Sequence, residues 1–370
     1  MSALHPRKAA THALDRVGLL DRLLWLRARV GRRDLAVLTY HRIGCVEDAG
    51  ELDPGLFDAT PAQLAAELEV LRAHATVVSL ADVRRFFQGA RRPPNAVLVT
   101  FDDAYADVEE HALPLLRRAG VPATVFVPTA FPEGGRLFWW DRIWLLMRRC
   151  RRDRMELAYP ERLVLHPTRS WRAAARALLD AAKRAERLDL ARLWEAVEQA
   201  GGIALDAAEE RALATRTALG WPSLRRLRDA GMDVQSHSHD HLILNSLPPD
   251  VAQRDLMRSA RTLREALGEA PYALAYPVGY ELAGAHRDAP RAAGFELAFT
   301  NGTGLCTPER ADPLNVPRVS LDLDLPLASY KALLLIGDGR WARPMWAPAS
   351  GSAARPPDPR ERASAEASRT

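Results

Sequence analysis

Two short clusters of acidic and histidine residues could together bind a metal ion and hydrolyse a bond. Asp102 and Asp103 are adjacent and directly follow the apolar stretch 96–101, which predicts a buried strand. Three of the ten histidines lie within residues 237–241. One carboxylate and two imidazoles are a mixed ligand set typical of open, hydrolytic metal sites. The second carboxylate could then act as a general base.

The local geometry of the two clusters leaves alternatives open. In an extended chain, successive side chains point in opposite directions, so Asp102 and Asp103 could take different roles, one at a cation and one facing substrate. If the histidine segment turns helically, His237 and His241 share a face and His239 points away. If the segment stays extended, His239 becomes a substitute ligand. Taken alone, the Asp pair is equally typical of a turn or a helix N-cap.

Both clusters follow predicted strands in a chain that alternates strands with helices. Strands are predicted at 35–40, 76–80, 96–101, 123–127, 232–236 and 272–276, with weaker ones at 298–300 and 315–319. Helices are predicted at 61–73, 107–119, 249–268 and 283–293. This alternation favours an α/β fold, a distorted (β/α) barrel of seven or eight mainly parallel strands. Polar residues at the carboxyl ends of barrel strands line the active-site face, so the two clusters are expected to meet there.

Three further segments differ from the barrel pattern. Residues 1–34 contain an amphipathic, basic helical segment that could pack on the barrel or rest on a membrane surface. The barrel is expected to span 35–340, with an arginine- and alanine-rich helical insertion at about 138–220. Residues 347–370 are rich in Pro, Ser, Ala and charge and predict a disordered tail.

The composition is that of a globular protein without a membrane span. Of the 370 residues, 48% are hydrophobic and 26% are charged, and the net charge is only +4. This small excess of positive charge is typical of solvated helix faces, so we expect no nucleic-acid partner. Three widely spaced cysteines suggest no disulfide framework, and the N-terminal segment lacks the pattern of a signal peptide. We therefore expect a cytoplasmic protein, with membrane association as the alternative for its basic helix.

An ordered set of motifs resembles the polysaccharide deacetylase family, whose catalytic unit is the NodB homology domain. TFDD at 100–103 is similar to the first family motif, and HSHDH at 237–241 is similar to the second, H-[ST]-x-x-H. The resemblance covers about 35–320 and implies hydrolysis of N-acetyl groups on the sugars of a poly- or oligosaccharide. The supporting motifs follow in the expected order: TYHRIG (39–44), VPATVFVPT (121–129), FWWD (138–141) and AYPVGY (275–280).

The resemblance also implies roles for individual residues. Asp102 corresponds to the general base, and Asp103, His237 and His241 correspond to the ligands of a divalent cation, with zinc expected first and cobalt, nickel or iron as alternatives. Standard members supply a general acid from a late histidine, but no histidine follows His286 here. A subset that looks circularly permuted carries an early Tyr-His instead, which implies that His41 is the acid.

The chain departs from the family pattern at three points. Ala104 replaces a common glycine and is expected to crowd the substrate approach, and Val278 replaces an aromatic residue. An arginine of the third motif is missing, and Arg318 could supply its charge. Backbone N–H groups near 277–280 are expected to help bind the oxyanion. The substrate-binding candidates are Tyr105, Trp140, Pro277, Gly279, Tyr280 and Arg318.

Two other functions fit the same residues. One is a metal-dependent amidohydrolase acting on a non-sugar amide, because a fold alone does not fix the substrate. The other is a catalytically degenerate barrel that binds glycan or a membrane-bound synthesis complex. We expect a carbohydrate to be the main partner, and the sequence does not predict an oligomeric state.

Overall fold

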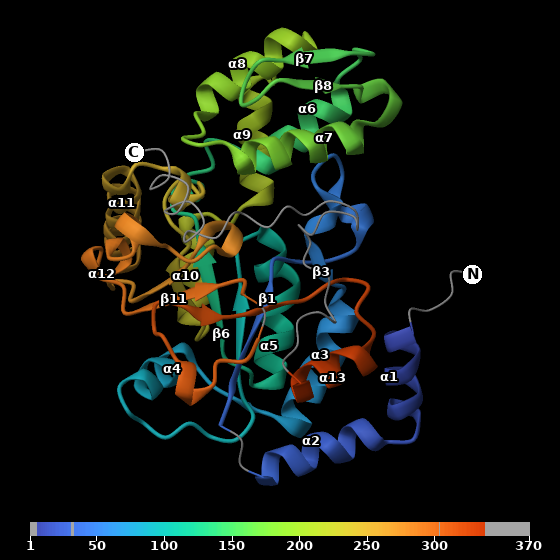
Figure 1. Cartoon of the computed structure of the whole chain (residues 1–370), viewed down its shortest axis with the longest axis vertical. Helices are drawn as coiled ribbons and strands as arrows, with labels where there is room; N and C mark the ends of the chain where they lie inside the picture. The colour runs from blue at the N-terminus through green and yellow to red at the C-terminus, as the bar shows by residue number, and fades with distance from the viewer. Residues whose placement is uncertain (1–5, 31–32, 303, 337–370) are drawn as a thin grey trace, which may run out of the picture.

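A sheet of parallel strands forms the centre of the computed structural model, which describes residues 6–30, 33–302 and 304–336 (Figure 1). The strand order is β12-β11-β10-β9-β6-β5-β1-β13, and β4 pairs with β5 beside this path. The strands are β1 (Leu35–Tyr40), β4 (Thr76–Val77), β5 (Ala96–Phe101), β6 (Ala123–Val127), β9 (Asp233–Ser236), β10 (Ala273–Ala275), β11 (Leu297–Thr300), β12 (Val316–Pro317) and β13 (Val319–Ser320).

One extended segment brings the two edges of this sheet together. Strand β12 pairs with β11, and after the single residue Arg318 the chain continues as β13, which pairs with β1. The two edge strands are therefore consecutive parts of one segment, and the sheet nearly closes into a barrel. This confirms the predicted, mainly parallel (β/α) barrel.

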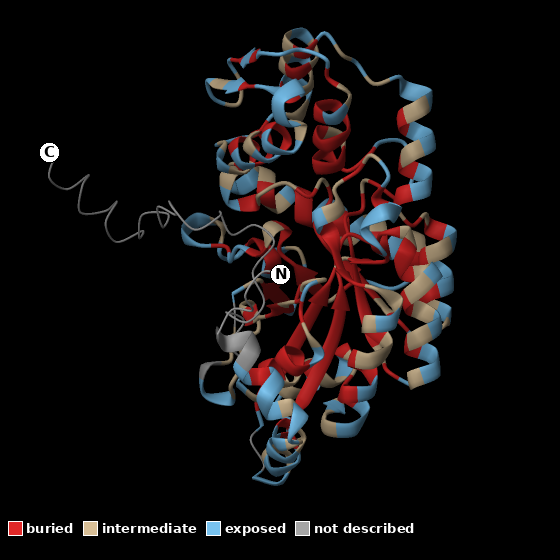
Figure 2. Ribbon diagram, turned by 90° about the vertical axis from the view of Figure 1, so that its right-hand side faces the viewer, coloured by how far each residue is buried: buried red, intermediate tan, exposed pale blue. Residues whose placement is uncertain are grey.

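Helices surround the barrel, as the buried strands and partly exposed helices in Figure 2 show. The N-terminal helices α1 and α2 both pack against α13, and α2 also contacts α3. The surrounding helices are α1 (Pro6–Arg16), α2 (Leu19–Val30), α3 (Pro61–His74), α4 (Leu80–Phe87), α5 (Leu113–Ala119), α10 (Trp221–Asp229), α11 (Pro249–Leu267), α12 (Ala289–Ala292) and α13 (Leu327–Ile336).

Local residue types correct two of the predicted boundaries. The strand predicted at 76–80 stops after Val77, because the Ser79 hydroxyl caps α4 by accepting a hydrogen bond from the Asp82 N–H. The helix predicted at 283–293 is reduced to a 3₁₀ turn followed by the short α12. The predicted tail, 347–370, and the last four residues of the predicted barrel lie outside the described residues.

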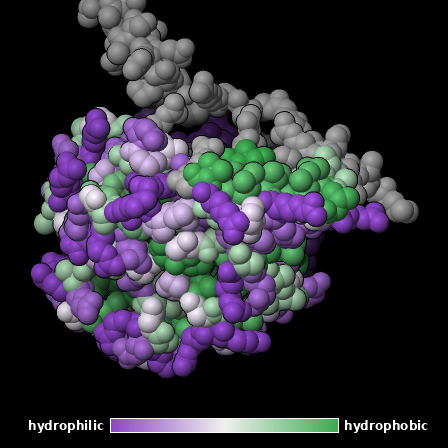
Figure 3. Space-filling view, turned by 90° about the horizontal axis from the view of Figure 1, so that it is seen from below, coloured by the Kyte–Doolittle hydropathy of each residue, from purple (hydrophilic) through white to green (hydrophobic). Residues whose placement is uncertain are grey.

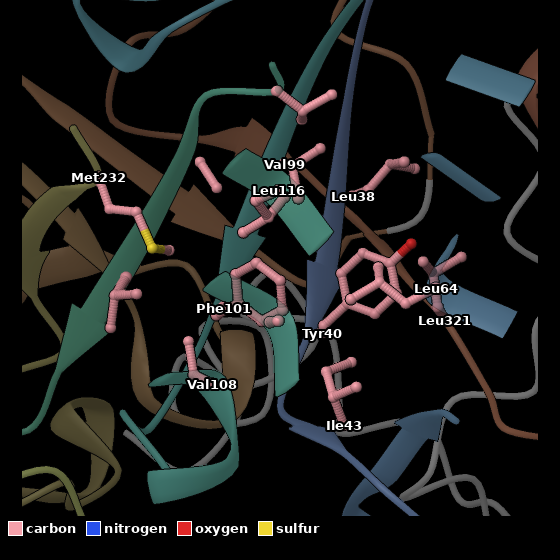
Figure 4. Packing of buried hydrophobic residues seen from close by; sticks show 14 of the residues in the cluster. Leu38, Tyr40, Ile43, Leu64, Val99, Phe101, Val108, Leu116, Met232 and Leu321 are labelled. Atoms are coloured by element: carbon pink, nitrogen blue, oxygen red, sulfur yellow. The ribbon is translucent and has the colours of Figure 1, made fainter. Parts of the chain in front are cut away.

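Side-chain alternation along the strands separates an outer core from the barrel interior. In β1 and β5 the outward residues pack against the helices, where the Tyr40 and Phe101 rings stack at 5.3 Å between centroids (Figure 4). Leu35 and Val37 belong to the interior cluster instead. This period of two continues past the strand ends. It aims His41 and Asp102, neighbours in the parallel register, into the barrel at its carboxyl end.

The segment between β6 and α10 forms a second layer above the carboxyl ends of the strands (green in Figure 1). It has a hydrophobic cluster of its own, rich in aromatic residues, whereas α10 contributes to the outer core of the barrel. The layer is mainly helical, as predicted, but it also contains a short antiparallel strand pair, residues 155–157 with 163–165. The elements of this layer are α6 (Trp139–Arg149), β7 (Met155–Leu157), β8 (Leu163–Leu165), α7 (Pro167–Arg184), α8 (Leu190–Gly201) and α9 (Ala207–Thr217), and a small parallel pair, β2 (Arg42–Ile43) and β3 (Phe57–Ala59), lies nearby.

Candidate active site

A cavity of about 210 Å³ opens between the carboxyl ends of the strands and the inserted helices. It brings together six of the residues singled out in the sequence, although they lie as far apart as positions 41 and 241. These residues are His41, Asp102, Asp103, Trp140, His237 and His241.

Three ligand atoms converge in this cavity. The Asp103 Oδ1 atom lies 3.5 Å from His237 Nε2 and 3.2 Å from His241 Nε2, and the two Nε2 atoms lie 3.2 Å apart. Tetrahedral ligands at about 2.1 Å from one zinc ion are about 3.4 Å from one another. Asp103 Oδ1 is buried and receives no hydrogen bond from the described residues, as expected of an atom that faces a cation. The residues present therefore fit one divalent metal ion.

The orientation and protonation of His237 suit a metal ligand. Its Nδ1–H donates a hydrogen bond to the Ala275 carbonyl at 2.8 Å, which leaves the Nε2 lone pair facing the cavity. Burial lowers the pKa of His237 to about 4. The ring is therefore neutral at neutral pH, as metal coordination requires.

The two Asp residues do not point in opposite directions, contrary to the expectation from an extended chain. Asp102 continues β5, and its N–H donates to the Tyr40 carbonyl at 2.8 Å. At Asp103 the backbone turns into the left-handed region, with φ at +69°, followed by +57° at Ala104. The turn cancels the alternation, so both carboxylates reach the same cavity.

The histidine segment is neither helical nor extended but forms a tight turn. Ser238 and His241 both have positive φ, and the Ser238 hydroxyl accepts a hydrogen bond from the His241 N–H at 3.1 Å. The Asp255 carboxylate of α11 accepts hydrogen bonds from the N–H groups of His239 and Asp240, between these two residues. His239 faces away and contacts the Thr129 hydroxyl at 2.8 Å, so it is not the substitute ligand.

Arg318 holds the Asp102 carboxylate with two parallel hydrogen bonds of 2.8 and 2.7 Å. Burial alone would raise the pKa of Asp102, but the Arg318 guanidinium outweighs it and holds this pKa well below its usual range. Arg318 is fully buried and does not line the cavity, so its side chain lies behind Asp102 rather than at a substrate. Its position matches the suggestion that it supplies the missing positive charge.

His41 is paired with an acid that the sequence analysis did not single out. Its Nδ1 atom lies 2.9 Å from Asp58 Oδ2 of β3. Burial lowers the pKa of His41, but the Asp58 charge and hydrogen bond, together with Asp102 and Asp103, raise it to about 9. The His41 ring is therefore protonated at neutral pH, the state that a general acid needs.

Four of the other substrate-binding candidates lie outside the cavity lining. The Tyr105 hydroxyl is buried, donates to Asp141 at 2.9 Å and accepts from the Trp140 indole at 2.7 Å. Pro277 is buried, Tyr280 is exposed, and Val278 lines the cavity in their place.

Gly279 has a structural reason to be glycine. With φ at +79°, a Cβ there would lie 2.3 Å from the Asn301 Cβ, so any side chain would displace the neighbouring strand end. Its N–H donates to the Tyr276 carbonyl at 2.8 Å and is not available to an oxyanion.

Helix α7 adds a charged wall that sequence reasoning missed. Arg176, Asp180 and Lys183 line the cavity from one face of this helix. Their spacing of four and then three residues was the available signal, since it places three charges on one helical face. Burial lowers the pKa of Lys183, as expected for an amine held against the cavity rather than in water.

Comparison with known proteins agrees with this geometry. The family model described as polysaccharide deacetylase matches residues 89–159 and 198–298, which include Asp102, Asp103, His237 and His241. No curated protein matched the sequence significantly.

Among solved structures, the Streptococcus pyogenes deacetylase PplD in complex with acetate is similar, with a TM-score of 0.54 at 17% identity, over 83% of this chain and 99% of that one. The polysaccharide deacetylase BC0361 from Bacillus cereus has a TM-score of 0.50 at 15% identity, over 82% of this chain and 69% of that one. At these sequence identities, the similarity to the solved structures shows the fold alone. The family match, the motifs in their order and the convergence of their residues show that the chain belongs to the polysaccharide deacetylase family, hydrolases that act on N-acetylated sugars.

Proposed function

We propose that this protein is a metal-dependent hydrolase that removes N-acetyl groups from the sugars of a poly- or oligosaccharide. One observation carries the proposal: three ligand atoms from Asp103, His237 and His241 converge within the cavity, with Asp102 and His41 beside them. The donor set of two imidazoles and one carboxylate favours zinc, with cobalt, nickel or iron as alternatives.

In the proposed mechanism the protein residues hold and move protons. A divalent cation bound by the three ligands would polarise a water molecule and the acetamide carbonyl. Asp102 is kept ionised by Arg318, so it can take a proton from the attacking water. His41 is kept protonated by Asp58, so it can give a proton to the departing sugar amine.

The shape of the cavity supports a substrate that enters by one end. Its volume of about 210 Å³ is below the range of about 300–1,000 Å³ that is usual for small-molecule sites. Helices α6 and α7 line it from the inserted layer, and the Trp139, Trp140 and Trp144 rings are buried rather than displayed along an open groove. We infer that a terminal N-acetylated sugar binds here while the rest of the glycan stays outside.

The direct test measures acetate release from N-acetylglucosamine oligomers, with and without a chelator. Release should require added metal, and mass spectrometry should find the lost acetyl group on a terminal sugar. A folded protein that releases no acetate with any of the four metals would instead support a glycan-binding barrel. Acetate or ammonia release only from non-sugar amides would support the amidohydrolase alternative.

Two matched variants separate the roles of the adjacent carboxylates. Asp102→Asn should abolish turnover and leave the metal content nearly unchanged, whereas Asp103→Asn should lose the metal. Asp240→Asn is the control, because this carboxylate is in the same loop as His241 but does not line the catalytic cavity. Loss of metal in Asp102→Asn with retention in Asp103→Asn would show that the two roles are exchanged.

A further inference from the structure

Helix α2 carries a second apolar stripe that faces solvent. Its Leu20 and Leu24 are buried against the rest of the protein. A separate set, which we call the α2 stripe, repeats at helical spacing on another face. Its members are Leu19 (37% exposed), Leu23 (39%), Leu26 (49%) and Val30 (68%).

The stripe is part of a wider apolar surface at one end of the molecule. Trp25 is 52% exposed on the same helix, and Val17 and Leu14 are exposed where α1 leads into α2. Figure 3 views the molecule from this end and shows hydrophobic side chains gathered beside hydrophilic ones. Contiguous exposed apolar surface of this kind marks an interaction site more often than single exposed residues do.

Positive charge borders this surface. Arg16, Arg22, Arg29 and Arg33 are all exposed along the same helices and the residues that follow. The Arg29 guanidinium lies 3.5 Å from the centre of the Trp25 ring, which pairs a cation with an amphipathic aromatic group. The nearby acids are already engaged, because Lys331 contacts Asp15 at 2.9 Å and Asp21 at 2.8 Å.

We propose that α2 docks this protein on the surface of an anionic lipid membrane. An interfacial helix combines an apolar face with flanking arginines, and both features are present on the exposed side of α2. A second copy of the chain fits less well, since a two-fold contact would bring the same arginine-rich surface together, and the described acids of α1 and α2, Asp15 and Asp21, already contact Lys331. No helix in the described ranges is long and apolar enough to cross a membrane, so the contact is peripheral.

Docking through α2 would leave the catalytic cavity accessible. Helix α2 ends at Val30 and β1 begins at Leu35, so α2 lies at the amino end of the barrel strands, whereas the cavity lies at their carboxyl end (Figure 1). No residue of α2 lines the cavity. Binding to lipid and hydrolysis of a soluble substrate should therefore be separable.

The test is co-sedimentation of the full chain with vesicles. The protein should bind vesicles of phosphatidylglycerol mixed with phosphatidylcholine, bind pure phosphatidylcholine weakly, and lose affinity as salt rises. Arg22→Glu/Arg29→Glu should weaken binding at least about tenfold, since each arginine near an anionic surface contributes roughly fivefold. Leu23→Ser/Leu26→Ser should weaken it at every salt concentration.

Two control variants match these changes away from α2. Arg258→Glu/Arg261→Glu reverses two exposed arginines of α11, and Val164→Ser/Met257→Ser replaces exposed apolar residues of β8 and α11. Both should bind vesicles like the unchanged protein. All four variants should release acetate from soluble oligomers at the unchanged rate, which keeps this test independent of the proposed activity.

Three results would overturn the proposal. The first is that the full chain does not bind anionic vesicles. The second is that it binds uncharged vesicles as strongly as anionic ones. The third is that the control variants lose as much binding as the α2 variants. Self-association that depends on Leu23 and Leu26, in a chain that ignores vesicles, would assign the surface to a second copy.

Discussion

At the scale of single residues, one buried partner controls the protonation state of each proposed proton-transfer group in the candidate site. Arg318 keeps Asp102 ionised, and Asp58 keeps His41 protonated. The two pKa values are displaced in opposite directions, as the proposed roles of base and acid in one cavity require. Neither Arg318 nor Asp58 is adjacent in sequence to the residue that it controls.

The His41–Asp58 pair predicts how activity depends on pH. Because the pKa of His41 is raised to about 9, its proton is retained below that pH and lost as the pH rises through it. Acetate release should therefore fall on the alkaline side near pH 9. Asp58→Asn removes the charge that raises this pKa, so the alkaline fall should move to lower pH, which a kcat/KM profile measures.

The Asp240→Asn variant serves as the control, since this carboxylate is outside the catalytic cavity. Its pH profile should match that of the unchanged protein. An alkaline limb that stays in place in Asp58→Asn would mean that His41 is not the acid.

At the scale of elements, the inserted helices contact the loop that holds His241, a proposed metal ligand. The Trp139 indole at the start of α6 donates to the His241 carbonyl at 3.1 Å, and the Trp140 ring lies 4.4 Å from the His241 ring. The Tyr105 hydroxyl then joins Trp140 to Asp141. The insertion is thus one wall of the cavity and also a support for one of its ligands.

Removing the Tyr105 hydroxyl should affect stability more than substrate binding. Tyr105→Phe leaves the buried Trp140 N–H without its acceptor and removes the hydrogen bond to Asp141 Oδ2, while the Asp53 N–H still donates to Asp141 Oδ1. We expect a loss of about 1–3 kcal/mol in the free energy of unfolding. The KM for the oligomers should stay nearly unchanged, because Tyr105 does not line the cavity. Urea denaturation and steady-state kinetics provide the two measurements.

Tyr272→Phe is the matched control, because the Arg84 guanidinium contacts the Tyr272 ring, which phenylalanine keeps, so this variant should retain nearly full stability. A large rise in KM for Tyr105→Phe at unchanged stability would restore Tyr105 as a substrate contact.

At the scale of the whole molecule, the proposed metal ligands connect two segments that are far apart in sequence. Asp103 follows β5 and His241 follows β9, so a cation bound by both fastens two segments of the fold. A ligand that binds only the folded state stabilises it by about 2.7 kcal/mol at 100 times its Kd. The melting temperature should therefore rise when zinc is added and fall with a chelator.

Asp103→Asn should remove this zinc-dependent rise, and Asp240→Asn should retain it. An equal rise in both variants would place the bound zinc elsewhere on the protein. The measurement is a thermal melt followed by circular dichroism at several zinc concentrations.

The sequence by itself determined the alternating strands and helices, the barrel class and the positions of both candidate metal-binding motifs. These features depend on local periodicity and on short spacings, which are visible along the chain. Local rules failed at Asp103 and Ser238, where positive φ values reverse the direction expected from an extended or helical backbone. Such turns are held by contacts that are distant in sequence, such as the hydrogen bonds that the His239 and Asp240 N–H groups donate to Asp255.

Only the tertiary structure decided which charges meet. Asp58, Arg318 and Lys183 come from a short strand, the closing segment of the barrel and an inserted helix, and no spacing in the sequence relates them to positions 41 and 102. Barrel closure places Arg318 behind Asp102, and the insertion places Lys183 at the cavity. Periodicity reports the face on which a residue lies, whereas the partner on that face is fixed only when the elements pack together.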